Sequence, residues 1–260
     1  MKVLALSYMR NEADIAIYTV PAMIEQGIDC YIIDNWSTDA TYDLIMHYTY
    51  RYHKHCTLER WPEAPDRFFC LAGLLGRVER AAKQRHDYDW YVLFGADEFL
   101  EGPYNARLID ALENADAVGA TCVDFASVDF QPTDNEWWAG IDPREHFQHW
   151  SRGRRAVNIR AWKGTEFHLV DSHDVQMPER RVLSVPFIIR HYPWRSQEQA
   201  TRKVFEERKP RYDPAELKIG WHRHMDQYEP GHRFIQDPAT LHKYDPETFY
   251  DEVLACRGAS

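Results

Sequence analysis

Residues 90–94 read Trp-Tyr-Val-Leu-Phe, an uncharged run of aromatic and aliphatic side chains. Such a run is typical of a strand buried on both faces of a parallel sheet, although a short buried helix has the same pattern. Gly95 and Ala96 end the run, and two adjacent carboxylates follow, Asp97 and Glu98. Ligands of open α/β sheets bind beyond the carboxyl ends of the strands, where carboxylates can hold a hard divalent cation. The alternative is structural, with Asp97 capping a following helix and Glu98 in its first turn.

The rest of the chain alternates between strand and helix patterns. Apolar runs predict strands at residues 3–8, 28–33 and 56–59, and apolar residues at helical spacing predict helices at 14–26, 39–50 and 68–86. Further on, the patterns predict helices at 105–113 and 197–208, strands at 117–125 and 182–189, and a long loop at 131–150. Strands that alternate with helices indicate a parallel sheet with crossover helices. We therefore predict an α/β fold with a mostly parallel central sheet flanked by helices and an irregular C-terminal extension.

Charge and cysteine usage exclude several classes of protein. The formal net charge of -10 argues against nucleic acid and anionic membranes as partners, because both attract basic surfaces. The five cysteines are scattered and form no C-x-x-C pair, which is typical of reduced thiols in a cytosolic protein. No stretch reaches the roughly 18 apolar residues of a membrane span, and the N-terminus lacks the apolar core of a signal peptide. We expect a cytoplasmic protein without stable membrane insertion.

Four segments follow one another in an order that is itself informative. They are NEADI at residues 11–15, YIIDNWSTDAT at 31–41, DWYVLFGADEFL at 89–100, and HYPWRSQEQATRKV at 191–204, which GWHR follows at 220–223. Together they resemble the glycosyltransferase family 2 type with a GT-A fold, specifically its bacterial branch with DADEF and HFPLRSxEQxxRKV signatures. The resemblance implies a single GT-A-like (Rossmann-like) domain over residues 1–260. Its nucleotide-binding half would span about residues 1–115. Its second half, about residues 116–260, would bind the acceptor and close the metal site.

The resemblance also implies a nucleotide-sugar donor, with a UDP-sugar favoured, and a glycan or small-molecule acceptor. Asp34 would contact the nucleobase, and the backbone near Ser7 and Asn11 would line the same pocket. Arg195 and Lys203 are candidate partners of the diphosphate, since guanidinium offers phosphate a bidentate fork and ammonium a point charge. The alternative for Lys203 is an ordinary exposed position on a helix.

A divalent cation, Mn²⁺ or Mg²⁺, is implied as the cofactor that neutralises the leaving group. Asp97 would be its ligand, and a late histidine, His191 or His173, would complete the shell. The chain departs from the family at Gly95, where the pattern has an aspartate, so that DAD has become GAD. The missing carboxylate is the one that approaches the ribose and the outer metal shell, which leaves a non-catalytic relative open.

An inverting transfer, which family 2 favours, needs a carboxylate base to take the proton of the acceptor hydroxyl. The candidates after the strand predicted at 117–125 are Asp124, Asp129, Asp134 and Glu136. Asp129 is the expected base, because it should lie just beyond the strand, where acceptors enter.

Two other classes of function remain. A nucleotidyltransferase would share the diphosphate chemistry but would need a glycine-rich loop after the first strand, whereas the chain has SYMRNEAD there. A module that binds sugar nucleotides or glycans without turnover is the second alternative, and Gly95 is its motivation.

Overall fold

A computed structural model describes residues 1–153 and 157–258 of the chain. Within them a ten-stranded sheet runs through β12 (His242–Lys243), β7 (His149–Arg152), β6 (Cys122–Phe130), β8 (Ile159–Lys163), β4 (Trp90–Leu93), β1 (Val3–Met9), β2 (Asp29–Asp34) and β3 (Cys56–Arg60). β11 (Phe187–His191) branches from this path, pairing with β6 and with β5 (Glu98–Glu101). The four strands β3, β2, β1 and β4 are parallel, as are β6 and β11, and the remaining pairs are antiparallel.

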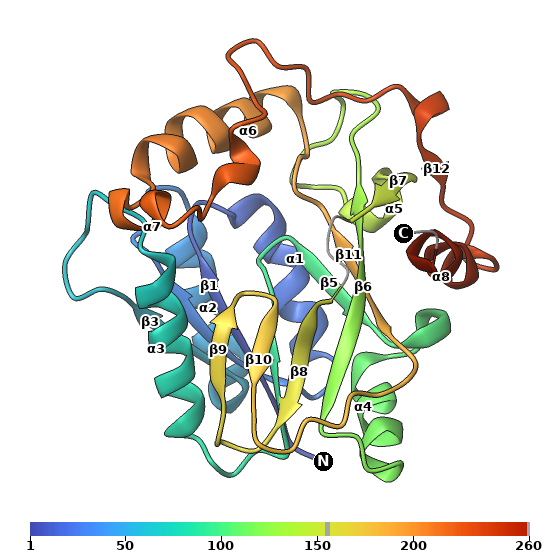
Figure 1. The fold of residues 1–260 in the computed structure, drawn as a ribbon. Coiled ribbons are helices and arrows are strands. Elements are labelled where there is room, and N and C mark those ends of the chain that lie inside the picture. Colours follow the sequence, from blue (N-terminus) through green and yellow to red (C-terminus); the bar gives the residue numbers. More distant parts are fainter. Residues whose placement is uncertain (154–156, 259–260) are drawn as a thin grey trace.

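Helices cover both faces of this sheet (Figure 1). α1 (Ala13–Ile24), α2 (Thr41–Tyr52) and α4 (Leu108–Ala117) share one apolar core, while α3 (Leu71–Lys83) shares another with the hairpin of β9 (His168–Asp171) and β10 (Asp174–Gln176). β1 serves both cores, because Val3 and Ala5 enter the first and Leu4 and Leu6 the second. That alternation explains why the strand patterns read as continuous apolar runs. The predicted α/β class with helices on a central sheet is confirmed.

The C-terminal part is built from short elements. α6 (Gln197–Arg202) continues directly into a π-helical segment, η3 (Lys203–Arg208), so the helix predicted at 197–208 is present but changes its winding in the middle. Short turns follow at η4 (Lys209–Arg211), α7 (Pro214–Lys218), η5 (Arg223–Met225) and η6 (Pro238–Thr240), before α8 (Phe249–Gly258) packs near β6 and β7. The loop predicted at 131–150 contains one helical turn, α5 (Pro143–His146). Two 3-10 turns, η1 (His53–His55) and η2 (Pro103–Asn105), complete the regular structure.

The segment after β4 forms a tight turn and then a strand. The Glu98 amide donates to the carbonyl of Gly95 at 3.2 Å, and β5 begins at Glu98. The alternative of a helix capped by Asp97 is therefore wrong. No helix in the described part of the chain combines the length and apolar character that a bilayer span requires.

Candidate functional site

The loops that follow β1, β2 and β4 meet at one edge of the sheet, because these strands are parallel neighbours. In Figure 1 the N-terminus lies at the opposite edge, and α6 lies over the carboxyl edge. Asn11 and Trp36, in the first two loops, both have φ of 55°. This left-handed conformation suits asparagine but is uncommon for tryptophan. The arrangement is the one expected for a ligand site of an open α/β sheet.

Asn11 ties the first two loops together, and Asp34 holds the second of them to Arg60 at the end of β3. The Asp34 carboxylate is fully buried and accepts hydrogen bonds from the Ser37 amide, at 3.2 Å, and from Arg60 Nε, at 3.0 Å. Asn11 Oδ1 accepts from the Thr38 amide at 2.8 Å. Ser7 lies in β1, fully buried, and its hydroxyl has no hydrogen-bond partner among the described residues. The structure therefore brings Asp34 and Asn11 together, with Ser7 behind them in the strand.

The turn after β4 explains the glycine at position 95. A buried ion pair joins Glu98 to Arg160, and the same carboxylate accepts the Gly95 amide at 2.5 Å. A Cβ atom at position 95 would lie 3.0 Å from both Asp97 Oδ1 and Glu98 Cδ. Glu98 and Asp97 thus occupy the space that a side chain on residue 95 would need.

Lys203 joins this turn to the loop after β1. Its ammonium lies 2.7 Å from Glu12 Oε1 and 2.8 Å from Asp97 Oδ2, and its side chain is only 8% exposed. Burial alone would raise the pKa of Asp97, but the charges of Lys203 and His191 outweigh it and hold that pKa well below its usual value. Lys203 is therefore a buried counter-ion of two carboxylates and not an exposed helix residue.

Arg195 is the best-connected cation of the site and has no exposed surface. Its guanidinium donates to both oxygens of Asp14, each at 2.9 Å, to Glu12 Oε2 at 2.8 Å and to the Tyr192 carbonyl at 3.1 Å. Both carboxylates raise its pKa against the effect of burial. With its donors used in this way, Arg195 holds the start of α1 against the segment after β11.

His191 links Asp97 to Asp129 in a row across the ends of neighbouring strands. His191 and Asp129 are paired in register between β11 and β6, and Nδ1 lies 2.7 Å from Asp129 Oδ1. Nε2 lies 3.6 Å from Asp97 Oδ2. Burial lowers the pKa of His191, but the two carboxylates more than compensate and raise it to about 10. The ring is therefore an imidazolium at neutral pH, which donates a hydrogen bond to Asp129 and forms a longer ion pair with Asp97.

His173 belongs to a different group of contacts. Its Nδ1 lies 3.1 Å from Asn158 Oδ1 and 3.3 Å from Arg160 Nη1. Through Arg160 it is connected to Glu98. The other histidine proposed from the sequence, His191, lies 3.6 Å from Asp97.

The residues proposed to hold a divalent cation do not fit one as they lie. Within residues 1–153 and 157–258, no group of three His, Cys, Asp or Glu side chains is arranged to hold a metal ion. An ion beside Asp97 would need further oxygen ligands, and the carboxylate of Glu12, which shares Lys203 with Asp97, is one candidate. The ammonium of Lys203 already lies between these two carboxylates.

Sequence reasoning missed two acidic residues and three arginines near this edge. Glu12 and Asp14 lie inside the NEADI segment, and two carboxylates directly after a buried strand are a signal that cations must lie nearby. Three arginines, Arg10, Arg208 and Arg211, lie close enough for their charges to act on one another. Their positions follow from contacts between distant parts of the chain, which no local pattern shows.

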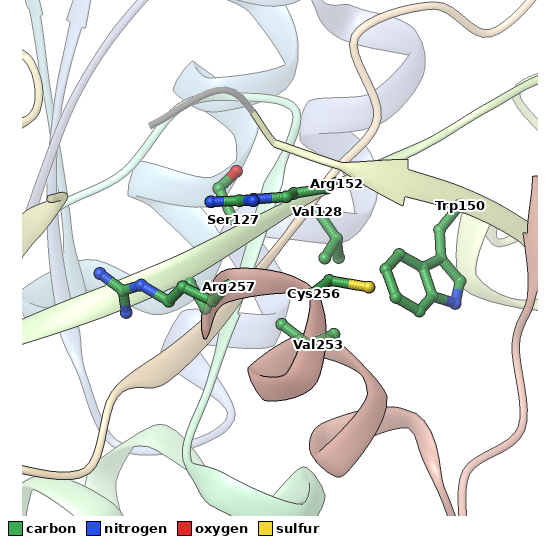
Figure 2. Close-up of a pocket in the computed structure, with 8 residues that line it drawn as sticks. Ser127, Val128, Trp150, Arg152, Val253, Cys256 and Arg257 are labelled. Carbon is green, nitrogen blue, oxygen red and sulfur yellow. The ribbon is translucent and has the colours of Figure 1, made fainter. Parts of the chain in front are cut away.

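Two cavities lie away from the row formed by Asp97, His191 and Asp129. One, of about 10 Å³, lies between α8 and β6, where Val253 and Cys256 face Val128 and Trp150 (Figure 2). This volume has room for about one water molecule. The other, of about 400 Å³, lies between Asn135 and the outer side of α6. Only the second is large enough to receive part of a substrate.

No family model matches this sequence, and neither does any curated protein. Solved structures do match it. TarS of S. aureus, residues 1–349 in complex with UDP, has a TM-score of 0.39 and 13% identity over 50% of this chain and 36% of that one. The mannosyltransferase PcManGT of Pyrobaculum calidifontis, in complex with GDP-Man and Mn²⁺, has a TM-score of 0.34 and 18% identity over 51% of this chain and 36% of that one.

A putative glucose-1-phosphate thymidylyltransferase of Bacillus anthracis, in complex with a sucrose, has a TM-score of 0.36 and 12% identity. That match covers 88% of this chain and 79% of the other. The matches to TarS and PcManGT span only about a third of those chains. At these values the comparisons assign neither a family nor an activity.

Proposed function

We propose that this protein is a glycosyltransferase with a GT-A-like fold. It transfers a sugar from a nucleotide-diphosphate sugar, a UDP-sugar first, to a hydroxyl of a glycan or small-molecule acceptor, with inversion. The observation that carries the proposal is the row Asp97, His191 and Asp129, which lies at the carboxyl edge of the sheet. The four sequence segments that resemble family 2 supply the residues of this edge, which supports the same reading.

The donor is bound by the N-terminal half, at about residues 1–115. Asp34 and Asn11 hold the two loops against which the nucleoside lies, and Lys203 and His191 bring positive charge to the place where the diphosphate would leave. A sugar diphosphate leaves more easily when fixed positive charge stabilises it, because negative charge grows on it in the transition state. Arg195 acts as a positioning residue, since it has no exposed surface and holds Glu12 and Asp14.

Asp129 is the catalytic base of the proposal. Its side chain is 23% exposed, so an acceptor hydroxyl can reach it, and the hydrogen bond from His191 fixes its orientation. As the acceptor oxygen attacks the anomeric carbon, Asp129 takes the hydroxyl proton and the bond to the diphosphate breaks. The acceptor enters from the segment after β6, beside the cavity between Asn135 and α6.

No step of this proposal passes through a divalent cation, because Lys203 lies where such an ion would bind. The five cysteines are free thiols, which is consistent with the cytoplasmic location expected from the sequence.

The test is a screen of UDP-, GDP- and dTDP-sugars for release of the nucleoside diphosphate, with and without glycan acceptors. We expect slow hydrolysis of a UDP-sugar alone and faster release with an acceptor. A donor that binds in calorimetry but is never cleaved would instead identify a binding module. Release of pyrophosphate from a nucleoside triphosphate and a sugar phosphate would identify a nucleotidyltransferase.

A further inference from the structure

Lys203 occupies the position at which a cation would neutralise the carboxylates of the site. Its Nζ atom is 2.7 Å from Glu12 Oε1 and 2.8 Å from Asp97 Oδ2. A divalent ion that bridged the same two oxygens would lie at about 2.0–2.6 Å from each, in nearly the same space. Ammonium and ion would then repel each other at very short range, so they cannot share the position. Lys203 belongs to η3 and lies 106 residues from Asp97 in sequence.

Three arginines extend the positive charge from Lys203 toward the nucleotide loops. Arg208 lies five residues after Lys203, about one turn of the π-helical segment, and its Nη2 is 3.7 Å from the same Glu12 Oε1. Its guanidinium lies 5.2 Å from the ring centroid of Phe69. The Phe69 amide donates to the carbonyl of Arg211 at 2.5 Å. Arg10 lies close enough to the other two arginines for its charge to act on both Arg208 and Arg211.

Nearby carboxylates offset part of the charge of these arginines, since Glu207 acts on both Arg10 and Arg211. Asp34 and Asp39 also act on Arg10, and Asp66 acts on Arg211. Arg10 donates to the carbonyls of Asn35 and Trp36, and Arg211 to those of Asp66 and Arg67, and neither forms an ion pair among the described residues. Burial lowers the pKa of Arg211 to about 10, and the nearby charges of Arg10 and Arg208 add to that effect. All three side chains remain partly exposed. A cluster of half-buried, mutually repelling guanidiniums is stabilised when an anion binds among them.

We propose that this protein binds the diphosphate of its donor without a divalent cation, with Lys203 as the built-in counter-ion of Asp97 and Glu12 and the cluster of Arg10, Arg208 and Arg211 as the anion site. The inference rests on the proposed function, since it concerns the same donor. It goes beyond that function in assigning the task of the metal to side chains of this chain. It also gives the change from DAD to GAD a reason, because a site without a metal does not need the first aspartate of that motif, which Gly95 replaces.

The direct test is calorimetric titration of the wild-type protein with UDP, in EDTA and in millimolar MnCl₂. We expect the two dissociation constants to agree within about twofold, and free Mn²⁺ without UDP to show no loss of its electron paramagnetic resonance signal on addition of protein. If UDP binds only with Mn²⁺, or at least tenfold more tightly, the inference is overturned while the proposed function stands. If UDP and the other nucleoside diphosphates bind in neither buffer, both fall.

Variants at Arg211 and Lys203 test which positive charges bind the diphosphate. Arg211→Ala should weaken UDP binding in EDTA about ten- to a hundredfold, the effect of losing one charge-assisted contact. The control Arg107→Ala removes an exposed arginine that pairs with Asp110 and should leave the UDP affinity unchanged. Equal UDP affinity in Arg211→Ala and Arg107→Ala would remove the arginine cluster from the inference.

Lys203→Met tests whether the ammonium keeps the metal out. It should lose UDP affinity in EDTA and gain Mn²⁺ binding, because the ammonium between Glu12 and Asp97 is then gone. The matched control is Lys83→Met, which removes the partner of Glu79 one helical turn away. A folded Lys203→Met protein that keeps the wild-type affinity for UDP would contradict the role of Lys203. The wild-type titrations decide the inference even if this variant does not fold.

Discussion

Replacing Arg195 with alanine should destabilise the fold strongly. The side chain is fully buried, and its removal takes away a cation that Glu12 and Asp14 share, although Glu12 keeps Lys203. Breaking a buried ion pair by removing one partner costs about 3–5 kcal/mol, a large part of the roughly 5–15 kcal/mol that stabilises a typical domain. At about 2–4 °C per kcal/mol for a chain of this size, the melting temperature should fall by roughly 6–20 °C.

The free energy of unfolding is measured by urea denaturation and the melting temperature by thermal denaturation, both followed by circular dichroism. The rate of donor cleavage per folded molecule is measured on the same samples. Arg195→Lys should recover only part of the loss, because an ammonium cannot donate to both oxygens of Asp14 as the guanidinium fork does. The control is Arg181→Ala, since Arg181 and Glu179 form an exposed pair worth at most about 1 kcal/mol. If Arg195→Ala is as stable as this control but its turnover falls, Arg195 contacts the diphosphate and the structural role is refuted.

Three further changes test other parts of the site. Asp129→Asn should lower turnover by about a hundredfold or more while UDP affinity stays the same; equal turnover in steady-state assays would exclude Asp129 as the base. Gly95→Asp should cost about 1–3 kcal/mol, because its Cβ would lie 3.0 Å from Asp97 Oδ1; a variant with an unchanged melting temperature would show that the turn relaxes freely. Glu98→Gln leaves the buried Arg160 without its counter-ion and should cost about 3–5 kcal/mol in urea denaturation; a loss below 1 kcal/mol would mean that the pair is not needed.

The sequence was most informative where local pattern decides the structure. The uncharged runs predicted β1 and β4 to within a few residues, because a strand that serves two cores must be apolar at every position. The bounds of β2 and β3, which contain charged residues, were predicted equally closely. The strands predicted at 117–125 and 182–189 are present as β6 and β11 but lie further along the chain, so that Asp129 is inside β6 and not beyond it. The antiparallel strands β5, β7, β8, β9, β10 and β12 were missed. β5 has only four residues and begins at a carboxylate, so its pattern does not differ from that of a helix start.

The electrostatics of the site could not be predicted from sequence. Which cation neutralises Asp97 depends on where η3 lies relative to β4, and Lys203 is 106 residues away. The same signature residues, Arg195 and Lys203, were expected to face a ligand together. In the structure Arg195 has no exposed surface, and Lys203 lies between two carboxylates. A motif gives the residue types, whereas the fold decides which of them remain available to a substrate.

The measurement that tests the donor site most directly is hydrogen–deuterium exchange of the wild-type protein with and without saturating UDP in EDTA. The account predicts slower exchange at residues 10–12, 35–40 and 95–98, the three loops at the carboxyl edge, and at residues 203–211, which carry Lys203 and two of the arginines. Protection confined to other segments, such as α8 and β7 around the small cavity, would contradict it. So would UDP binding that leaves the exchange of all four of these segments unchanged.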